Sequence, residues 1–177
     1  YDQDVSPEKI VADALKAGCK SISYTYTEPT IFFEYAYDTA RIAKQKGLKN
    51  IFVTNGFMSG ACLEMAGPYL DATNVDLKAF SEEFYQERVG GKLKPVLENI
   101  KLMKQMGIWI EVTTLIIPGL NDSEQELRAI AEFLNSVSSD IPWHISAYYP
   151  QYKSRIEATS ADKIKQAQVI GKEAGLK

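Results

Sequence analysis

The chain has 177 residues, 45% hydrophobic and 24% charged, which is ordinary for one globular domain with a buried core. Its formal net charge is −3 with acids and bases interspersed, which excludes an extended nucleic-acid-binding face. No apolar run approaches the ~20 residues of a membrane helix, and the start at Tyr1–Asp4 is too polar for a signal peptide, so we expect a cytoplasmic protein. Cys19 and Cys62 lie too far apart for a metal motif, and we expect both to be reduced, structural thiols.

Strand and helix patterns alternate along the chain. Ser6 followed by Pro7 is typical of a helix start, and Ser123 with Glu126 has the spacing of a capping box. The segments rich in β-branched and aromatic residues predict strands at 21–26, 50–54, 71–77, 109–117 and 143–148. Amphipathic periodicity and glycine stops predict helices at 7–17, 30–46, 59–66, 81–88, 95–106, 123–137 and 160–174.

This alternation implies parallel strands joined by right-handed crossovers. An open doubly wound sheet and part of a (β/α) barrel both fit, and both bind ligands at the carboxyl ends of the strands. Several strands are nearly continuous apolar runs, which is typical of a sheet covered on both faces. No linker or repeat interrupts 1–177, which we predict to be a single domain. Because a helix pattern comes first, we expect a further strand upstream.

Polar residues stand where the first three predicted strands end. Glu28 can accept hydrogen bonds from a ligand ammonium group, although a glutamate at a helix start also complements the helix dipole. Asn55, followed by glycine, forms either a plain turn or a binding loop. Alternation places Asn74, Asp76 and Lys78 on one face, where they pair with one another or hold a ligand.

The last two predicted strands add further polar residues. Glu111 and Thr113 share one face and could line the same interior, whereas the lone His144 is interpreted as a packed, hydrogen-bonded residue. The side chains of Tyr149, Tyr152 and Lys153 follow at the expected mouth. A core needs no polar groups at successive strand ends and a pocket does, so the pattern predicts a ligand site.

Four segments together are distinctive. They are SYTYTEPT at 23–30, FVTNGF at 52–57, NVDLK at 74–78 and EVTTLIIPGLND at 111–122. Over essentially its whole length the chain resembles radical S-adenosylmethionine (SAM) proteins related to pyruvate formate-lyase activating enzyme, in the branch called the AmmeMemoRadiSam-system radical enzyme. The resemblance implies an open (β/α)6 barrel of parallel strands, incomplete here at both ends.

The resemblance also implies an activity. In such enzymes a [4Fe–4S] cluster on a Cys-x-x-x-Cys-x-x-Cys loop binds SAM and cleaves it reductively to a 5′-deoxyadenosyl radical, which abstracts hydrogen from a substrate. The implied partners are a protein substrate of the glycyl-radical type and an electron donor such as flavodoxin or ferredoxin. The cysteine loop is expected before Tyr1 and a further strand after Lys177. We therefore expect this segment alone to be inactive and to self-associate through exposed sheet edges.

The resemblance assigns cofactor contacts to residues of this chain. The implied cofactor-binding residues are Thr27, Glu28, Thr54, Asn55, Asp76, Lys78 and Thr113. Glu28 would meet the methionine ammonium group, in a segment whose Tyr26 and Thr27 replace two glycines of the family. Thr54 and Asn55 would line the ribose side.

The remaining assignments concern the third strand and the departures from the family. Lys78 would balance the methionine carboxylate, and Asp76 would orient Lys78 or the ribose. Val53 replaces an aspartate of the activating enzymes, and Ala147 and Tyr149 replace an arginine and a histidine of the branch. No catalytic residue and no metal ligand is assigned in this chain.

Two other functions fit the same residues. The first is a non-redox α/β-barrel enzyme that uses Glu28, Asp76, Lys78 and Glu111 for acid–base chemistry, or Lys78 for a Schiff base. The second is a degenerate domain that acts only by binding.

Overall fold

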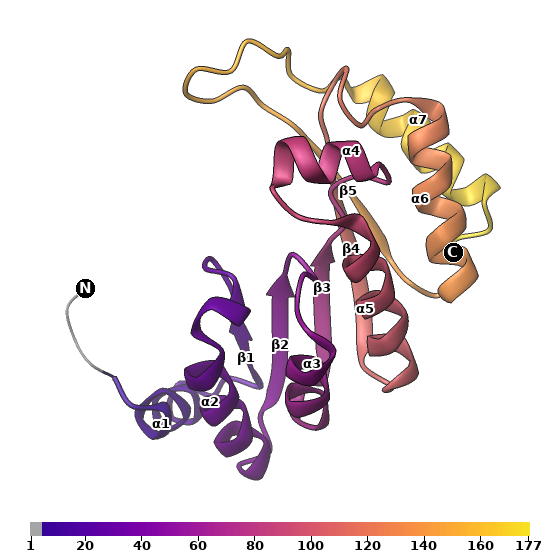
Figure 1. The fold of residues 1–177 in the computed structure, drawn as a ribbon. Coiled ribbons are helices and arrows are strands. Elements are labelled where there is room, and N and C mark those ends of the chain that lie inside the picture. The colour runs from indigo at the N-terminus through magenta and orange to yellow at the C-terminus, as the bar shows by residue number, and fades with distance from the viewer. Residues whose placement is uncertain (1–4) are drawn as a thin grey trace.

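A computed structural model describes residues 5–177, so the polar start at 1–4 lies outside the described residues. Its five strands are β1 (Ser21–Tyr24), β2 (Lys49–Thr54), β3 (Ala72–Asp76), β4 (Trp109–Ile116) and β5 (Trp143–Ala147). All neighbours pair in parallel, and the order in space, β1-β2-β3-β4-β5, is the order along the chain (Figure 1). A doubly wound sheet reverses its strand order at a switch point, and this sheet does not. The predicted α/β fold of the partial-barrel kind is confirmed.

Helices follow the strands in chain order. The α-helices are α1 (Pro7–Lys16), α2 (Phe33–Gln45), α3 (Gly60–Ala66), α4 (Glu82–Phe84), α5 (Leu93–Gln105), α6 (Glu124–Val137) and α7 (Ala161–Glu173). Short 3-10 turns η1 (Pro29–Phe32) and η2 (Gly67–Tyr69) and a π-helical turn η3 (Tyr85–Val89) complete the set. Serine side chains accept a backbone N–H at five helix starts, which fixes where these helices begin. The five capping residues are Ser6, Ser59, Ser81, Ser123 and Ser160.

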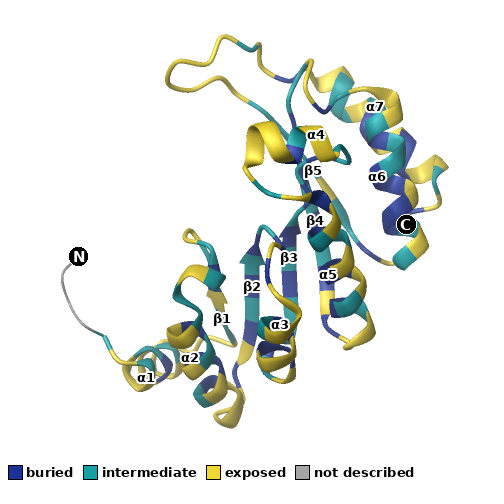
Figure 2. Ribbon diagram, viewed as in Figure 1, coloured by how far each residue is buried: buried dark blue, intermediate teal, exposed yellow. Residues whose placement is uncertain are grey.

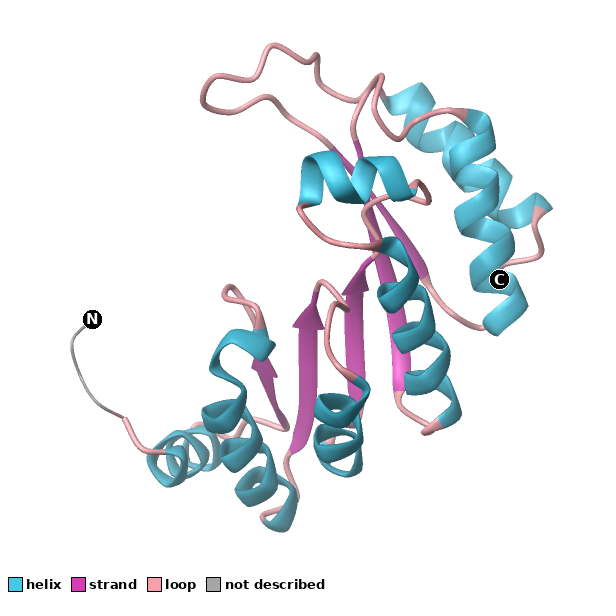
Figure 3. Cartoon of the chain, in the orientation of Figure 1, coloured by secondary structure: helices cyan, strands magenta, loops and turns pink. Residues whose placement is uncertain are grey.

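The long helices gather on one face of the sheet (Figure 3). Along β2, β3 and β4 buried residues alternate with half-buried or exposed ones, as Figure 2 shows by colour. The prediction of a sheet covered on both faces was therefore wrong for the described residues. The apolar runs misled because Ile51 and Val53 extend the run of Phe52 but lie on the less buried face.

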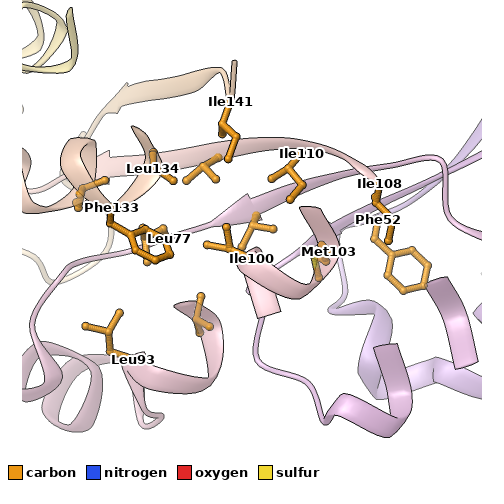
Figure 4. Packing of buried hydrophobic residues seen from close by; sticks show 14 of the residues in the cluster. Phe52, Leu77, Leu93, Ile100, Met103, Ile108, Ile110, Phe133, Leu134 and Ile141 are labelled. Carbon is orange, nitrogen blue, oxygen red and sulfur yellow. The ribbon is translucent and has the colours of Figure 1, made fainter. Parts of the chain in front are cut away.

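The core lies between the sheet and the helices (Figure 4). Phe52 and Ile110 from the strands pack with Ile100 and Met103 of α5 and Leu134 of α6, and all are almost inaccessible to solvent. Burial of this face stabilises the sheet. The opposite, less buried face carries polar side chains such as Asp76, Glu111 and Thr113 beside Ile51 and Val53.

Two predicted boundaries shift for local reasons. β1 ends at Tyr24 rather than at Tyr26, because Tyr26 has a left-handed backbone with φ 68° that cannot continue a strand. α5 begins at Leu93, so that Pro95 lies in its first turn, where the missing N–H leaves no hydrogen bond unmade.

The predicted capping box of α6 is only half formed. Ser123 Oγ accepts from the Glu126 N–H, as predicted. The Glu126 carboxylate does not return to Ser123 but accepts from the N–H of Phe80, beyond the end of β3. Glu126 therefore links α6 to the loop that follows β3.

Within residues 5–177, no helix is both long and apolar enough to span a bilayer.

Candidate functional site

A cavity of about 340 Å³ opens where β1, β2 and β3 end. It is lined by Thr25, Tyr26, Thr27, Glu28, Val53, Thr54, Asn55, Asp76 and Lys78. Six of the seven residues predicted to bind the cofactor are among these nine. The three strand tips lie side by side because the strands are parallel neighbours, which brings segments some 25 residues apart to one place.

The Glu28 carboxylate ties the tip of β1 to the tip of β2. Its Oε1 accepts from the Thr54 hydroxyl at 2.6 Å, and its Oε2 accepts from the Asn55 N–H at 2.8 Å. The Thr30 hydroxyl also reaches Oε1, at 3.3 Å. A carboxylate offers about four lone-pair sites, so Oε2 keeps room for one more donor. Glu28 has no cationic partner within residues 5–177, which makes this wall of the cavity suited to a cation.

The loop after β2 has a shape that only glycine permits at its centre. Gly56 has φ 72°, and a Cβ there would meet Val75 Cγ1 at 2.8 Å. Asn99 of α5, which is buried, donates from Nδ2 to the carbonyls of Gly56 and Met58, both at 2.8 Å. The core therefore fixes this loop from behind.

Thr54 and Asn55 differ in what they can offer a ligand. Thr54 is buried, and its hydroxyl both donates to Glu28 and accepts from the Gly56 N–H. Asn55 Oδ1 accepts from the Phe57 N–H, while Asn55 Nδ2 has no hydrogen-bond acceptor among residues 5–177. Thr54 supports the site, and Asn55 can donate into it.

Asp76 and Lys78 form the third wall. Lys78 Nζ lies 3.1 Å from Asp76 Oδ2, and both side chains are about 40% exposed. The pair is open to the cavity rather than sealed in the core. Lys78 also lines a second, smaller cavity of about 200 Å³ together with Asn55, Phe57 and Tyr85.

Thr113, the seventh predicted residue, does not line the cavity. It pairs with Asp76 across the sheet, and its hydroxyl donates to Asn74 Oδ1 at 2.9 Å. Glu111, next on the same face, accepts from Trp109 Nε1 at 3.1 Å and lies 2.8 Å from His144 Nε2. The hydrogen bonds with Trp109 and His144 hold the pKa of Glu111 below its usual value.

His144 is therefore hydrogen-bonded, as predicted, but it is not packed. Its side chain is 51% exposed on the open face of β5. Tyr149 and Tyr152 lie in the loop after β5, are largely exposed and do not line the cavity. The predicted mouth residues are thus not brought to the site.

Sequence reasoning assigned no role to Thr25, Val53 or Thr30. The first two line the cavity, and Thr30 holds Glu28. Tyr26 replaces a family glycine yet has φ 68°, which is a conformation that favours glycine. A non-glycine residue there costs about 1 kcal/mol or more. The only sequence signal for a role of Tyr26 in the site was its position two residues before Glu28.

Neither cysteine belongs to a cluster of metal-ligating side chains among the described residues. Cys19 is exposed in the turn before β1, whereas Cys62 in α3 is half-buried. Burial, and then the charge of Glu28, raise the pKa of Cys62, which makes it a poor thiolate. Residues 5–177 contain no group of three or more His, Cys, Asp or Glu side chains that could hold a metal ion. These residues therefore do not fit an iron–sulfur cluster.

The cavity can bind a zwitterion. One wall carries the anion Glu28, which has no cationic partner in the described part of the chain, and another carries an accessible ammonium group, Lys78. An amino-acid moiety has the complementary charges, an ammonium and a carboxylate. The volume of about 340 Å³ lies within the range of small-molecule sites.

Comparison with known proteins gives one family. The family model of the Radical SAM superfamily matches residues 1–134. The uncharacterized protein MJ0808 of Methanocaldococcus jannaschii is 40% identical over 177 residues, which are 99% of this chain and 52% of that protein. The isethionate sulfite-lyase activating enzyme of Oleidesulfovibrio alaskensis is 25% identical over 122 residues, which are 66% of this chain and 40% of that enzyme.

Among solved structures, a domain of pyruvate-formate lyase-activating enzyme from Bacteroides vulgatus superposes with a TM-score of 0.71 at 20% identity. The match covers 89% of this chain and 96% of that one. The chain spans about half or less of the length of the two curated relatives above.

Proposed function

The chain belongs to the radical S-adenosylmethionine superfamily, and from that premise we propose that it forms the SAM-binding part of a radical enzyme of the activating-enzyme type. The observation that carries the proposal is the joint lining of one cavity by Glu28, Asn55 and Lys78 from three strand tips. We propose that 1–177 is a single domain of that enzyme.

The described residues fit the amino-acid end of SAM. Glu28 Oε2 accepts one hydrogen bond and meets no competing cation from residues 5–177, so it would accept from the ligand ammonium group. Lys78, whose side chain is 40% exposed beside Asp76, would meet the ligand carboxylate. Asn55 Nδ2 would donate to a ribose hydroxyl. Thr27 completes the lining beside Glu28, and the Thr113 hydroxyl donates to Asn74, which precedes Asp76 by two residues on β3.

On one-electron reduction, bound SAM would supply methionine and a 5′-deoxyadenosyl radical able to abstract hydrogen from a substrate. Because residues 5–177 do not fit an iron–sulfur cluster, the cluster that would supply this electron, and its donor flavodoxin or ferredoxin, would have to be provided from outside these residues. Two of the proteins compared above are named as activating enzymes of other enzymes, the isethionate sulfite-lyase activating enzyme and the pyruvate-formate lyase-activating enzyme, so we propose a protein as substrate. The role of residues 5–177 is then to hold the ligand by its charges and to fix its orientation.

Schiff-base chemistry at Lys78 is less well supported. A nucleophilic lysine is typically desolvated in an apolar pocket or placed beside another cation. Lys78 instead lies beside a carboxylate and is 40% exposed.

Titration calorimetry with SAM tests the proposal. Glu28→Gln and Lys78→Met should each weaken binding by about 10- to 100-fold, because each removes a charged hydrogen bond to the ligand. Lys94→Met is the matched control, since Lys94 forms a surface ion pair with Glu98 on α5 and should leave affinity unchanged. Wild-type protein that does not bind SAM, or that loses no affinity in either site variant, contradicts the proposal.

A further inference from the structure

The backbone just beyond β3 is held by side chains rather than by strand pairing. The pairing of β3 with β4 ends at Asp76 and Thr113. Beyond that point, four side chains form hydrogen bonds with backbone N–H and C=O groups of residues 77–80. The four bonds run from Thr114 Oγ1 to Leu77 O at 2.9 Å, from Lys78 N to Tyr85 Oη at 3.2 Å, from Asn121 Nδ2 to Lys78 O at 2.7 Å, and from Phe80 N to Glu126. Both peptide groups of Lys78 thus depend on side chains from elsewhere.

Asn121 joins the tips of two strands. It is 1% exposed, and its Nδ2 donates to Lys78 O and also to Leu115 O at 2.8 Å. Its Oδ1 accepts from the Ile117 N–H at 2.7 Å. Both amide protons and one oxygen lone pair are used, so the side chain has little freedom to move. It fixes the Lys78 carbonyl to the end of β4.

Tyr85 holds the other side of the same peptide. It is 2% exposed and begins the π-helical turn η3, a rare element that often occurs at functional sites. Burial, together with the nearby Asp76, raises the pKa of Tyr85 to about 12, so the phenol stays neutral. Its oxygen accepts from the Lys78 N–H, and its ring lines the cavity of about 200 Å³ that Lys78 also lines.

We propose that Tyr85 and Asn121 are positioning residues that fix the Lys78 backbone, so that the lysine amine meets the carboxylate of the bound ligand. The inference rests on the proposed function, because it assigns Lys78 to that carboxylate. A lysine side chain has four rotatable bonds, and an unanchored backbone would add further freedom. Site geometry must be held within about half an ångström by supporting hydrogen bonds to be effective.

Comparison of two ligands tests the proposal. SAM and decarboxylated SAM share every group except the carboxylate, so the difference between their affinities reports the contacts made to that carboxylate, which the proposed function assigns to Lys78. Tyr85→Phe removes the hydroxyl and keeps the ring, and should weaken SAM binding by about 5- to 30-fold while changing binding of decarboxylated SAM by less than about twofold. In a Lys78→Met background the same change should have no further effect on SAM.

Tyr24→Phe is the matched control. Tyr24 is also buried, and its hydroxyl donates to Asn50 Oδ1 at 3.0 Å, outside the residues that line the cavity. This variant should lose similar stability and keep the ratio of the two affinities. If Tyr85→Phe weakens the binding of both ligands equally, or of neither, the positioning role is overturned, although the proposal that the wild-type protein binds SAM stands. If wild-type protein binds neither ligand, the proposed function itself fails.

Hydrogen exchange in the wild-type protein gives a second measurement that needs no variant to fold. The Lys78 amide should exchange more than about 100-fold more slowly than exposed amides of the loop at 151–158, because it donates a partly buried hydrogen bond to the Tyr85 hydroxyl. Exchange of the Lys78 amide as fast as that of the loop would overturn the proposal that Tyr85 fixes the Lys78 backbone.

Discussion

The two ends of β2 and β3 carry the same residue types in opposite roles. At the amino ends stand Asn50 and Asp71, and at the carboxyl ends stand Asn55 and Asp76. Asn50 is wholly buried, with its side chain bonded to Tyr24 and to two backbone carbonyls. Asp71 accepts from Lys44, from Lys49 and from the Asn50 N–H.

The carboxyl-end pair is left incomplete. Among residues 5–177, the Asn55 side chain uses only its oxygen, and Asp76 has one side-chain partner, Lys78. The side chains of Asp76 and Lys78 are both about 40% exposed. Polar groups that are saturated by protein partners stabilise the fold, whereas groups with spare bonding capacity beside a cavity can bind a ligand. The sheet thus separates stability at one edge from binding at the other.

The largest effect is expected from Asn50→Ala. The variant leaves the Tyr24 hydroxyl and the Ala40 and Tyr69 carbonyls without their partner, which should lower the free energy of unfolding by about 3–4 kcal/mol. Denaturant unfolding measures the change. Asn55→Ala, the counterpart at the other end of β2, should cost less than about 1 kcal/mol. Equal costs would break the comparison.

Asp71→Asn is expected to cost about 2 kcal/mol and to leave SAM affinity unchanged. Burial raises the pKa of Asp71, but the hydrogen bonds from Lys49, Lys44 and the Asn50 amide outweigh burial, so the net pKa lies below its usual value. A lowered pKa means that the stabilisation is complete above about pH 5 and is lost as the pH falls below the ordinary value of about 3.9. The difference between wild type and variant should therefore shrink between pH 7 and pH 3 in denaturant titrations, and a constant difference would contradict this account.

The contrast between the ends explains what the sequence could and could not predict. Strand order and helix starts follow from local signals, such as Ser6 before Pro7 and the glycine after Asn55. Parallel topology then brings Glu28, Asn55 and Lys78 to one edge, which alternation alone could suggest. Nothing local shows that Thr113 lies beside Asp76 on the next strand without lining the cavity, because the register of β3 and β4 and the shape of the cavity decide that.

Support from distant residues was also beyond the sequence. Glu126 fits a capping box by spacing, yet it bonds Phe80, because the loop after β3 leaves an N–H that no strand satisfies. The roles of Tyr85 and Asn121 depend on the same loop, far away in the chain. Such tertiary hydrogen bonds join residues that are distant in the chain, so no periodic pattern in the sequence predicts them.

A smaller effect, on binding alone, is expected from Asp76→Asn. The exposed ion pair of Asp76 with Lys78 contributes little to stability, so the free energy of unfolding should change by less than about 0.5 kcal/mol. The Lys78 amine loses the partner that orients it, and SAM should bind about 3- to 10-fold more weakly. Calorimetry and unfolding on the same variant separate the two quantities. Destabilisation as large as that of Asp71→Asn would mean that both ends of β3 are structural.

The smallest effect concerns Thr73, which lies in β3 between the two aspartates and belongs to neither role. Its side chain is 1% exposed on the helix-covered face, and among the described residues its hydroxyl is a buried oxygen without a hydrogen-bond partner. Valine has nearly the same shape and no polar atom to desolvate. Thr73→Val should therefore raise the free energy of unfolding by about 0.5–1 kcal/mol and leave SAM affinity unchanged. A loss of stability would mean that the hydroxyl has a bound water, and that saturation reaches further along β3 than its two ends indicate.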